Sequence, residues 1–174
     1  MTRSAGNAVR FPDLVSRHPD VLDLVSKLVG TWAGHGEGDY PTIEPFRYRE
    51  LLTITERSDH PSLHYDQRAW REVPQGEVVS HWETGLLRIS SDGTLNVFNA
   101  QAGRGEAMRG TWAREGDSWL MQLESQQYAG DDRVLGSIRT LTVEDDTLSY
   151  KMSMSTVTTG RMEPHLRAVL SRTG

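Results

Sequence analysis

Histidines are the side chains of this protein best suited to hold a metal or to move a proton near neutral pH. The 174-residue chain has six histidines and no cysteine, which excludes disulfides, thiolate nucleophiles and cysteine-ligated iron. His81 stands in the middle of an alternating run, and His165 begins another near the end of the chain. Neither an H-E-x-x-H motif nor an H-x-H strand pair occurs, so a zinc hydrolase is not predicted. Taken alone, such a strand histidine is more often structural than a ligand.

Other catalytic groups have little support in the sequence. There is no G-x-S-x-G motif for a nucleophilic serine. The acid pairs Asp131-Asp132 and Asp145-Asp146 fall in turns, where we expect them to be solvated rather than to form a glycosidase pair. The remaining histidines are expected in loops or on the surface: His18, His35, His60 and His64.

A glycine-rich motif opens the first predicted strand, GTWAGHGEGDYPTI from Gly30 to Ile43. In a strand, Trp32, Gly34 and Gly36 share one face. Missing side chains on that face leave room for a flat ligand or for close backbone approach. Alternatively, the glycines let the strand bend while Trp32 fills one end of the fold. No Lys-Ser/Thr follows, so the motif is not a phosphate loop.

Near the C-terminus, Leu148, Tyr150, Met152 and Met154 alternate with polar residues, which predicts a strand with one inward face. The two methionines would give that face a soft, adaptable surface. Both core filling and a hydrophobic ligand pocket are compatible with this pattern.

The elements that carry these residues are predicted to be almost entirely strands. Helical spacing of apolar residues occurs only after Pro19 and stops at Gly30. Ten strand-like runs follow: 30–39, 46–57, 62–72, 77–90, 95–101, 106–114, 118–128, 133–143, 147–157 and 164–172. The short turns between them favour antiparallel neighbours, and closing the sheet would remove its exposed edges.

We therefore predict an all-β fold, a ten-stranded antiparallel up-and-down barrel of the calycin or fatty-acid-binding-protein shape with a short N-terminal helix. A β-sandwich is the alternative. Residues 1–18 are expected to form a loose lead-in and residues 19–174 a single domain. The formal charge of −5 argues against a nucleic-acid partner. Neither a membrane span nor a signal peptide is evident, so we expect a cytoplasmic protein without a membrane partner.

Several motifs together resemble the nitrobindins, a family of haem-binding β-barrels. The motif Gly30-x-Trp32-x-Gly34-x-Gly36 with its Tyr-Pro-Thr-Ile extension is the most specific match. The segment from His81 to Arg88, the segment from Asp146 to Tyr150 and the closing run from His165 to Arg172 also fit. The resemblance extends from about residue 24 to residue 172.

The resemblance implies one haem b per chain, with His165 as the axial ligand of the iron and the catalytic residue. It places His81 near the distal face and makes Thr42, Arg133, Met152 and Met154 candidate contacts of the haem. It implies an enzyme, a peroxynitrite isomerase that forms nitrate at ferric iron, and a protein that binds nitric oxide at ferrous iron. A homodimer is compatible with it. A non-catalytic carrier of a fatty acid or other small apolar ligand remains the alternative.

Overall fold

The computed structural model of the chain describes residues 18–56 and 62–173. The predicted lead-in, residues 1–18, lies outside these ranges except for His18, and so does His60. The elements in chain order are α1 (Pro19–Leu28), β1 (Gly30–Tyr40), β2 (Ile43–Glu56), β3 (Leu63–Val73), β4 (Gly76–Ile89), β5 (Thr94–Gln101), β6 (Arg104–Glu115), β7 (Ser118–Ala129), β8 (Val134–Glu144), β9 (Thr147–Thr156) and β10 (Glu163–Arg172).

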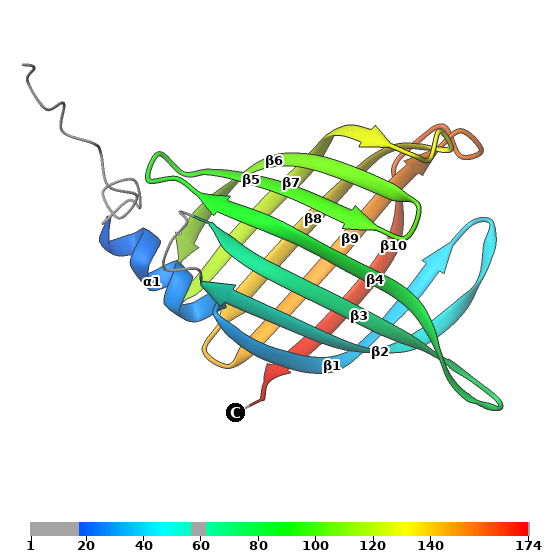
Figure 1. Cartoon of the computed structure of the whole chain (residues 1–174), viewed down its shortest axis with the longest axis horizontal. Coiled ribbons are helices and arrows are strands. Elements are labelled where there is room, and N and C mark those ends of the chain that lie inside the picture. Colours follow the sequence, from blue (N-terminus) through cyan, green and yellow to red (C-terminus); the bar gives the residue numbers. More distant parts are fainter. Residues whose placement is uncertain (1–17, 57–61, 174) are drawn as a thin grey trace, which may run out of the picture.

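The ten strands form one closed barrel in which each strand pairs antiparallel with its neighbours in sequence (Figure 1). The barrel closes where β1 meets β10, from the pair Trp32–Arg172 to the pair Gly38–Leu166. The predicted barrel is confirmed and the β-sandwich alternative is wrong. Among the described strands, closure leaves no unpaired edge at which another chain could add a strand.

Most strand bounds agree with prediction to within two residues, but β2 begins at Ile43 rather than at residue 46. The turn after β1 is tight, because Tyr40 pairs with Ile43 across only Pro41 and Thr42. Pro45 lies where the register of this pair shifts, between the pairs Tyr40–Ile43 and Gly38–Phe46. An irregular point in the ladder tolerates a residue without an N–H, so the proline does not end the strand.

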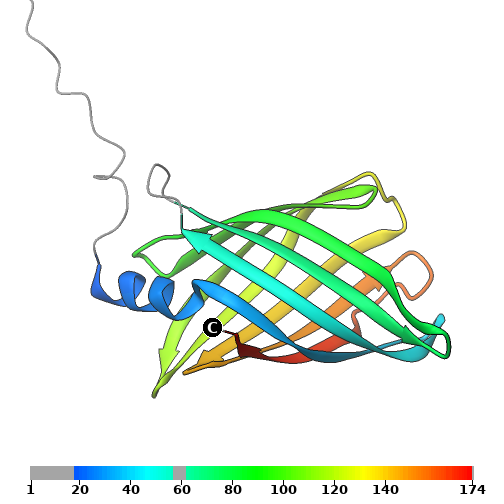
Figure 2. The same cartoon turned by 60° about the horizontal axis from the view of Figure 1, so that its bottom comes forward.

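One end of the barrel is sealed by α1, and the β1–β2 and β3–β4 hairpins lie at the other end (Figures 1 and 2). The helix buries Val21, Leu24 and Leu28. Trp32 is fully buried below it and donates its indole N–H to the carbonyl of Leu28 at 3.0 Å. The Arg172 guanidinium lies 4.2 Å above the Trp32 ring. Trp32 thus fills the helix end, which was one of the two interpretations of the glycine-rich motif.

The β1 glycines let aromatic rings of β2 approach the backbone. A Cβ added at Gly36 would overlap the ring of Tyr48, and one at Gly38 would overlap the ring of Phe46. None of the glycines of β1 lines the interior cavity. The sequence pattern allowed the glycines either to leave room for a ligand or to let backbone segments approach closely. In the structure they allow close approach.

Candidate functional site

A cavity of about 400 Å³ runs inside the barrel, and its lining changes in character along the barrel axis. At the end away from α1 it is lined by a group that we call the mouth chamber: Ile43, Phe46, Arg71, Ser80, His81, Arg104, Met152, His165 and Leu166. Next comes a polar belt: Tyr48, Glu50, Tyr65, Gln67, Glu83, Arg139 and Tyr150. Nearest α1 is an apolar inner chamber: Leu28, Leu52, Ile54, Leu87, Val97, Met108, Met121, Leu123, Leu141 and Leu148.

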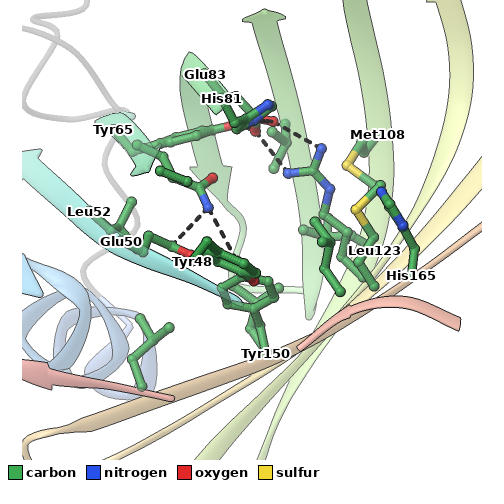
Figure 3. A pocket seen from close by; sticks show the side chains of 18 of the residues that line it. Tyr48, Glu50, Leu52, Tyr65, His81, Glu83, Met108, Leu123, Tyr150 and His165 are labelled. Atoms are coloured by element: carbon green, nitrogen blue, oxygen red, sulfur yellow. Dashed lines mark hydrogen bonds and ion pairs between the residues drawn. The ribbon is translucent and has the colours of Figure 1, made fainter. Parts of the chain in front are cut away.

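His165 lies at the start of β10 and lines the mouth chamber (Figure 3). Its Nδ1 is 3.4 Å from the backbone carbonyl oxygen of Asp39, and the edge of its ring packs against Tyr40. A carbonyl oxygen only accepts, so Nδ1 carries the proton and Nε2 keeps its lone pair. Burial lowers the pKa of His165 against the effect of the Asp39 contact, and the nearby positive charges of Arg104 and His81 lower it further. The neutral imidazole, the form that binds metals, is thereby favoured.

His81 also lines the mouth chamber, but its ring is engaged with the belt. Its Nε2 is 3.5 Å from a carboxylate oxygen of Glu83, and Figure 3 shows the two side chains next to each other. About a third of the His81 side chain is exposed. The structure therefore brings His81 and His165 into one chamber, with different partners.

The other predicted contacts are not all brought together. Met152 is buried and lines the mouth chamber, whereas half-buried Met154 does not line the cavity. Met154 keeps the regular register, paired with Ser137, and the register shift between β8 and β9 lies beyond it, between the pairs Gly136–Ser155 and Val134–Thr156. Ser155, next to this shift, is buried. Thr42 lies exposed in the β1–β2 turn, beside Ile43, which does line the cavity.

Arg133 lies outside the cavity, and its exposed guanidinium donates to the carboxylate of Asp131 at 2.8 and 3.0 Å. The arginines that do line the mouth chamber, Arg71 and Arg104, were not singled out from the sequence. The guanidinium of Arg71 lies 4.7 Å from the centre of the Phe46 ring, and that of Arg104 donates to Gln101. The alternation of residues along β6 could have identified Arg104, because Arg104 shares the inward face of this strand with Glu106 and Met108.

Arg139 organises one half of the belt and its surroundings. Its guanidinium donates to Glu83 at 2.8 and 3.1 Å and to Glu106 at 2.9 Å. Burial alone would raise the pKa of Glu83, but Arg139, His81 and Tyr65 hold it well below its usual range. Ser137 donates to the other oxygen of Glu106 at 2.6 Å. Glu83 is consequently ionised, and a single cation, Arg139, contacts both acids.

Glu50 organises the other half without a cation. Its two oxygens accept from the Tyr150 hydroxyl at 2.5 Å and from the Gln67 amide at 2.8 Å (Figure 3). Tyr48 and Tyr150 share a hydrogen bond of 2.8 Å. Glu50 is completely buried, and among the described residues no cationic group lies within ion-pair distance of it. Burial raises the pKa of Glu50 to about 7, although Tyr150 and Gln67 oppose the shift.

The fold and the site define a calycin-like barrel with a ligand chamber at one end and a histidine facing into that chamber. The family model of the THAP4-like, haem-binding β-barrel domain matches residues 21–172. The chain therefore belongs to this haem-binding family, that of the nitrobindins, as its motifs indicated.

Individual relatives agree with this assignment. A protein of Arabidopsis thaliana called peroxynitrite isomerase Rv2717c is 38% identical over 156 residues, covering 89% of this chain and 90% of the relative. A peroxynitrite isomerase of Nocardioides is 36% identical over 89% of this chain and 94% of its own length. The crystal structure of Rv2717c from M. tuberculosis superposes with a TM-score of 0.80 at 33% identity, covering 90% of this chain and 99% of that one.

Two other site classes find no support in the part of the chain that the structure describes. No group of three or more His, Asp or Glu side chains is placed to hold a bare metal ion. Within residues 18–56 and 62–173, no helix is long and apolar enough to cross a membrane.

Proposed function

We propose that the chain binds one haem b in the mouth chamber, with Nε2 of His165 as the axial ligand of the iron. The observation that carries this proposal is the orientation of His165, whose Nδ1–H points to the Asp39 carbonyl while the ring lines the chamber. Metal-bound histidines characteristically donate their second N–H in this way, which fixes the ring and its tautomer.

The chemistry of the chamber fits a haem. Phe46, Met152 and Leu166 offer apolar surface to the flat macrocycle. Arg71 and Arg104 place two guanidinium groups in the same chamber, where they would attract the two propionate carboxylates. We propose these arginines for that role in preference to Arg133, which is engaged with Asp131 outside the cavity. Thr42 and Met154 would then lie beside the haem site rather than within it.

The reaction that we propose is the conversion of peroxynitrite to nitrate, together with reversible binding of nitric oxide. Both relatives quoted above carry the name peroxynitrite isomerase. Haem iron, when bound, supplies the centre at which the peroxide bond of peroxynitrite is rearranged. The two anions have the same atoms and charge, so the net reaction requires no proton donor or acceptor from the chain.

The contributions of the chain itself would be binding and orientation. His165 would hold the iron from one side, and the apolar residues of the mouth chamber would limit the access of water. Arg71 and Arg104 would make the entrance attractive to an anionic substrate. His81 would line the pocket while its Nε2 stays engaged with Glu83.

A carrier of fatty acids is less well supported by the lining of the cavity. A fatty-acid carboxylate that entered the belt would need a free cation there, but the guanidinium of Arg139 already faces two carboxylates. Glu50 adds a third buried acid at the same level. An uncharged apolar ligand remains compatible with the inner chamber.

The enzymatic proposal is tested by stopped-flow decay of peroxynitrite with hemin-loaded protein. We expect faster decay than with the hemin-free chain and a larger yield of nitrate relative to nitrite. His165→Ala should lose at least about tenfold in rate, since it removes the side chain that would hold the haem iron. Decay that is equally fast with the hemin-free chain would contradict an isomerase.

A further inference from the structure

The polar belt and the inner chamber are not used by the proposed haem reaction, although they form most of the cavity wall. The inner chamber lies on the opposite side of the belt from His165 and is continuous with the mouth chamber. Its apolar side chains, Leu52, Met121 and Leu148 among them, offer a place for a short hydrocarbon tail. Which head group could accompany that tail depends on the charges of the belt.

The polar belt and its surroundings contain more buried acidic side chains than buried guanidinium groups. Glu50, Glu83 and Glu106 are at most 5% exposed, and they face one buried guanidinium, that of Arg139. Glu83 and Glu106 share this cation, so Glu50 is the acid without a counter-ion among the described residues. A buried carboxylate in this state is unfavourable, and a cation that enters beside it relieves the penalty. A carboxylate ligand in the belt would lie beside these acidic side chains, two of which already share the guanidinium of Arg139.

The hydrogen-bonding capacity around Glu50 also suits a cation. Each oxygen of Glu50 accepts one hydrogen bond, from Tyr150 or from Gln67, and a carboxylate oxygen has room for another. A primary ammonium group has three N–H donors. The rings of Tyr48 and Tyr150 line the same level and provide faces that attract cations.

One donor of the belt lacks a partner, which points to a second polar atom in the ligand. Nε of Arg139 is buried and makes no hydrogen bond within the described part of the chain, while both terminal nitrogens of the same guanidinium are used. Arg139 lines the cavity, and because Nε itself has almost no accessible surface, a ligand oxygen would reach it only after a small movement of the side chains that cover it. A hydroxyl oxygen accepts such a hydrogen bond without adding negative charge.

We infer that the belt and inner chamber form a binding site for a small aliphatic amino alcohol, whose ammonium pairs with Glu50, whose hydroxyl accepts from Arg139 and whose tail enters the inner chamber. This inference does not rest on the proposed haem reaction, because none of these groups contacts His165. It concerns a ligand of opposite charge to a fatty acid.

The test is isothermal titration of the hemin-free chain at pH 8, where Glu50 is ionised, with 2-amino-1-hexanol, hexylamine and hexanoate. We expect saturable binding of 2-amino-1-hexanol, binding of hexylamine weaker by about threefold or more, and no binding of hexanoate in the inner chamber. Hexanoate that binds as tightly as either amine and shifts the methyl signal of Met121 would overturn the inference. Equal affinity for the two amines would overturn the role of the hydroxyl.

Variants and location complete the test. Glu50→Gln keeps the size of the side chain and should weaken amine binding at least about tenfold, while Glu144→Gln, at an exposed strand end, should leave it unchanged. Methionine-methyl NMR should show shifts at Met121 of the inner chamber and none at exposed Met162. Unchanged affinity in folded Glu50→Gln, or shifts confined to Met162, would place the amine elsewhere. The titration uses the hemin-free chain. A negative result would therefore contradict the amino-alcohol site without bearing on the proposed haem reaction.

Discussion

Glu50 is an acid buried without a cation, and its ionisation should oppose folding. Burial raises its pKa from 4.5 to about 7 in the folded chain. Between these two values the folded state keeps a proton that the unfolded state has lost, so stability falls as the pH rises. The full difference amounts to about 3 kcal/mol above pH 7.

Replacing Glu50 by glutamine should therefore stabilise the folded chain more at high pH than at low pH. We expect the free energy of unfolding of Glu50→Gln, relative to the natural chain, to improve by about 3 kcal/mol between pH 4 and pH 8. Urea unfolding at a series of pH values measures this difference, and Glu144→Gln is the control for loss of an exposed acid. A pH-independent difference would mean that Glu50 is not the strained acid that the structure describes.

At the residue scale, the resemblance of the closing run to the nitrobindins indicates His165, and the alternation of residues 148–154 indicates the inward-facing Met152. It does not indicate Asp39, since the contact is made by a backbone carbonyl that any residue would supply. The belt is hidden for another reason. Glu50, Glu83 and Arg139 resemble surface charges, and only the closure of the barrel brings them together.

At the scale of the elements, close approach of β1 and β10 depends on a glycine. A Cβ at Gly34 would overlap the Val169 carbonyl oxygen and lie 2.8 Å from the Cα of Leu170, both of which are backbone atoms that a rotamer change cannot move. We expect Gly34→Ala to destabilise the fold by about 2 kcal/mol or more. Urea unfolding measures the loss.

A second strand glycine provides the matched control. A Cβ at Gly105 would meet its nearest atom, the Asn99 carbonyl oxygen, at 3.4 Å. Gly105→Ala should thus change the free energy of unfolding by less than about 1 kcal/mol. Equal losses for the two variants would show that the cost reflects glycine in strands generally and not the barrel seam.

The strands themselves are predictable because alternation and short turns are local signals. Irregularities in the ladder are not, since they depend on the partner strand. The shift between β9 and β10 falls between the pairs Pro164–Ser153 and Leu166–Met152 and so includes His165, and the shift between β1 and β2 admits Pro45 into a strand. Both lie at the end of the barrel that holds the mouth chamber, where the site residues are consequently the hardest to assign.

At the scale of the whole molecule, closure of the barrel creates two environments along one axis. The helix end is sealed by α1 and Trp32, whereas the opposite end presents His165, Arg71 and Arg104 to an entering ligand. Membership of a haem-binding family and the geometry at the open end both support the haem site that we propose. The central claim is that His165 holds a haem there.

Titration of the purified chain with hemin, followed by visible absorption, tests that claim most directly. The account predicts a saturable Soret band at one hemin per chain, which shifts or disappears in His165→Ala and is retained in His35→Ala, where an exposed histidine of the outer surface is removed. A band that does not saturate, or that is identical in the natural chain and in His165→Ala, would contradict it.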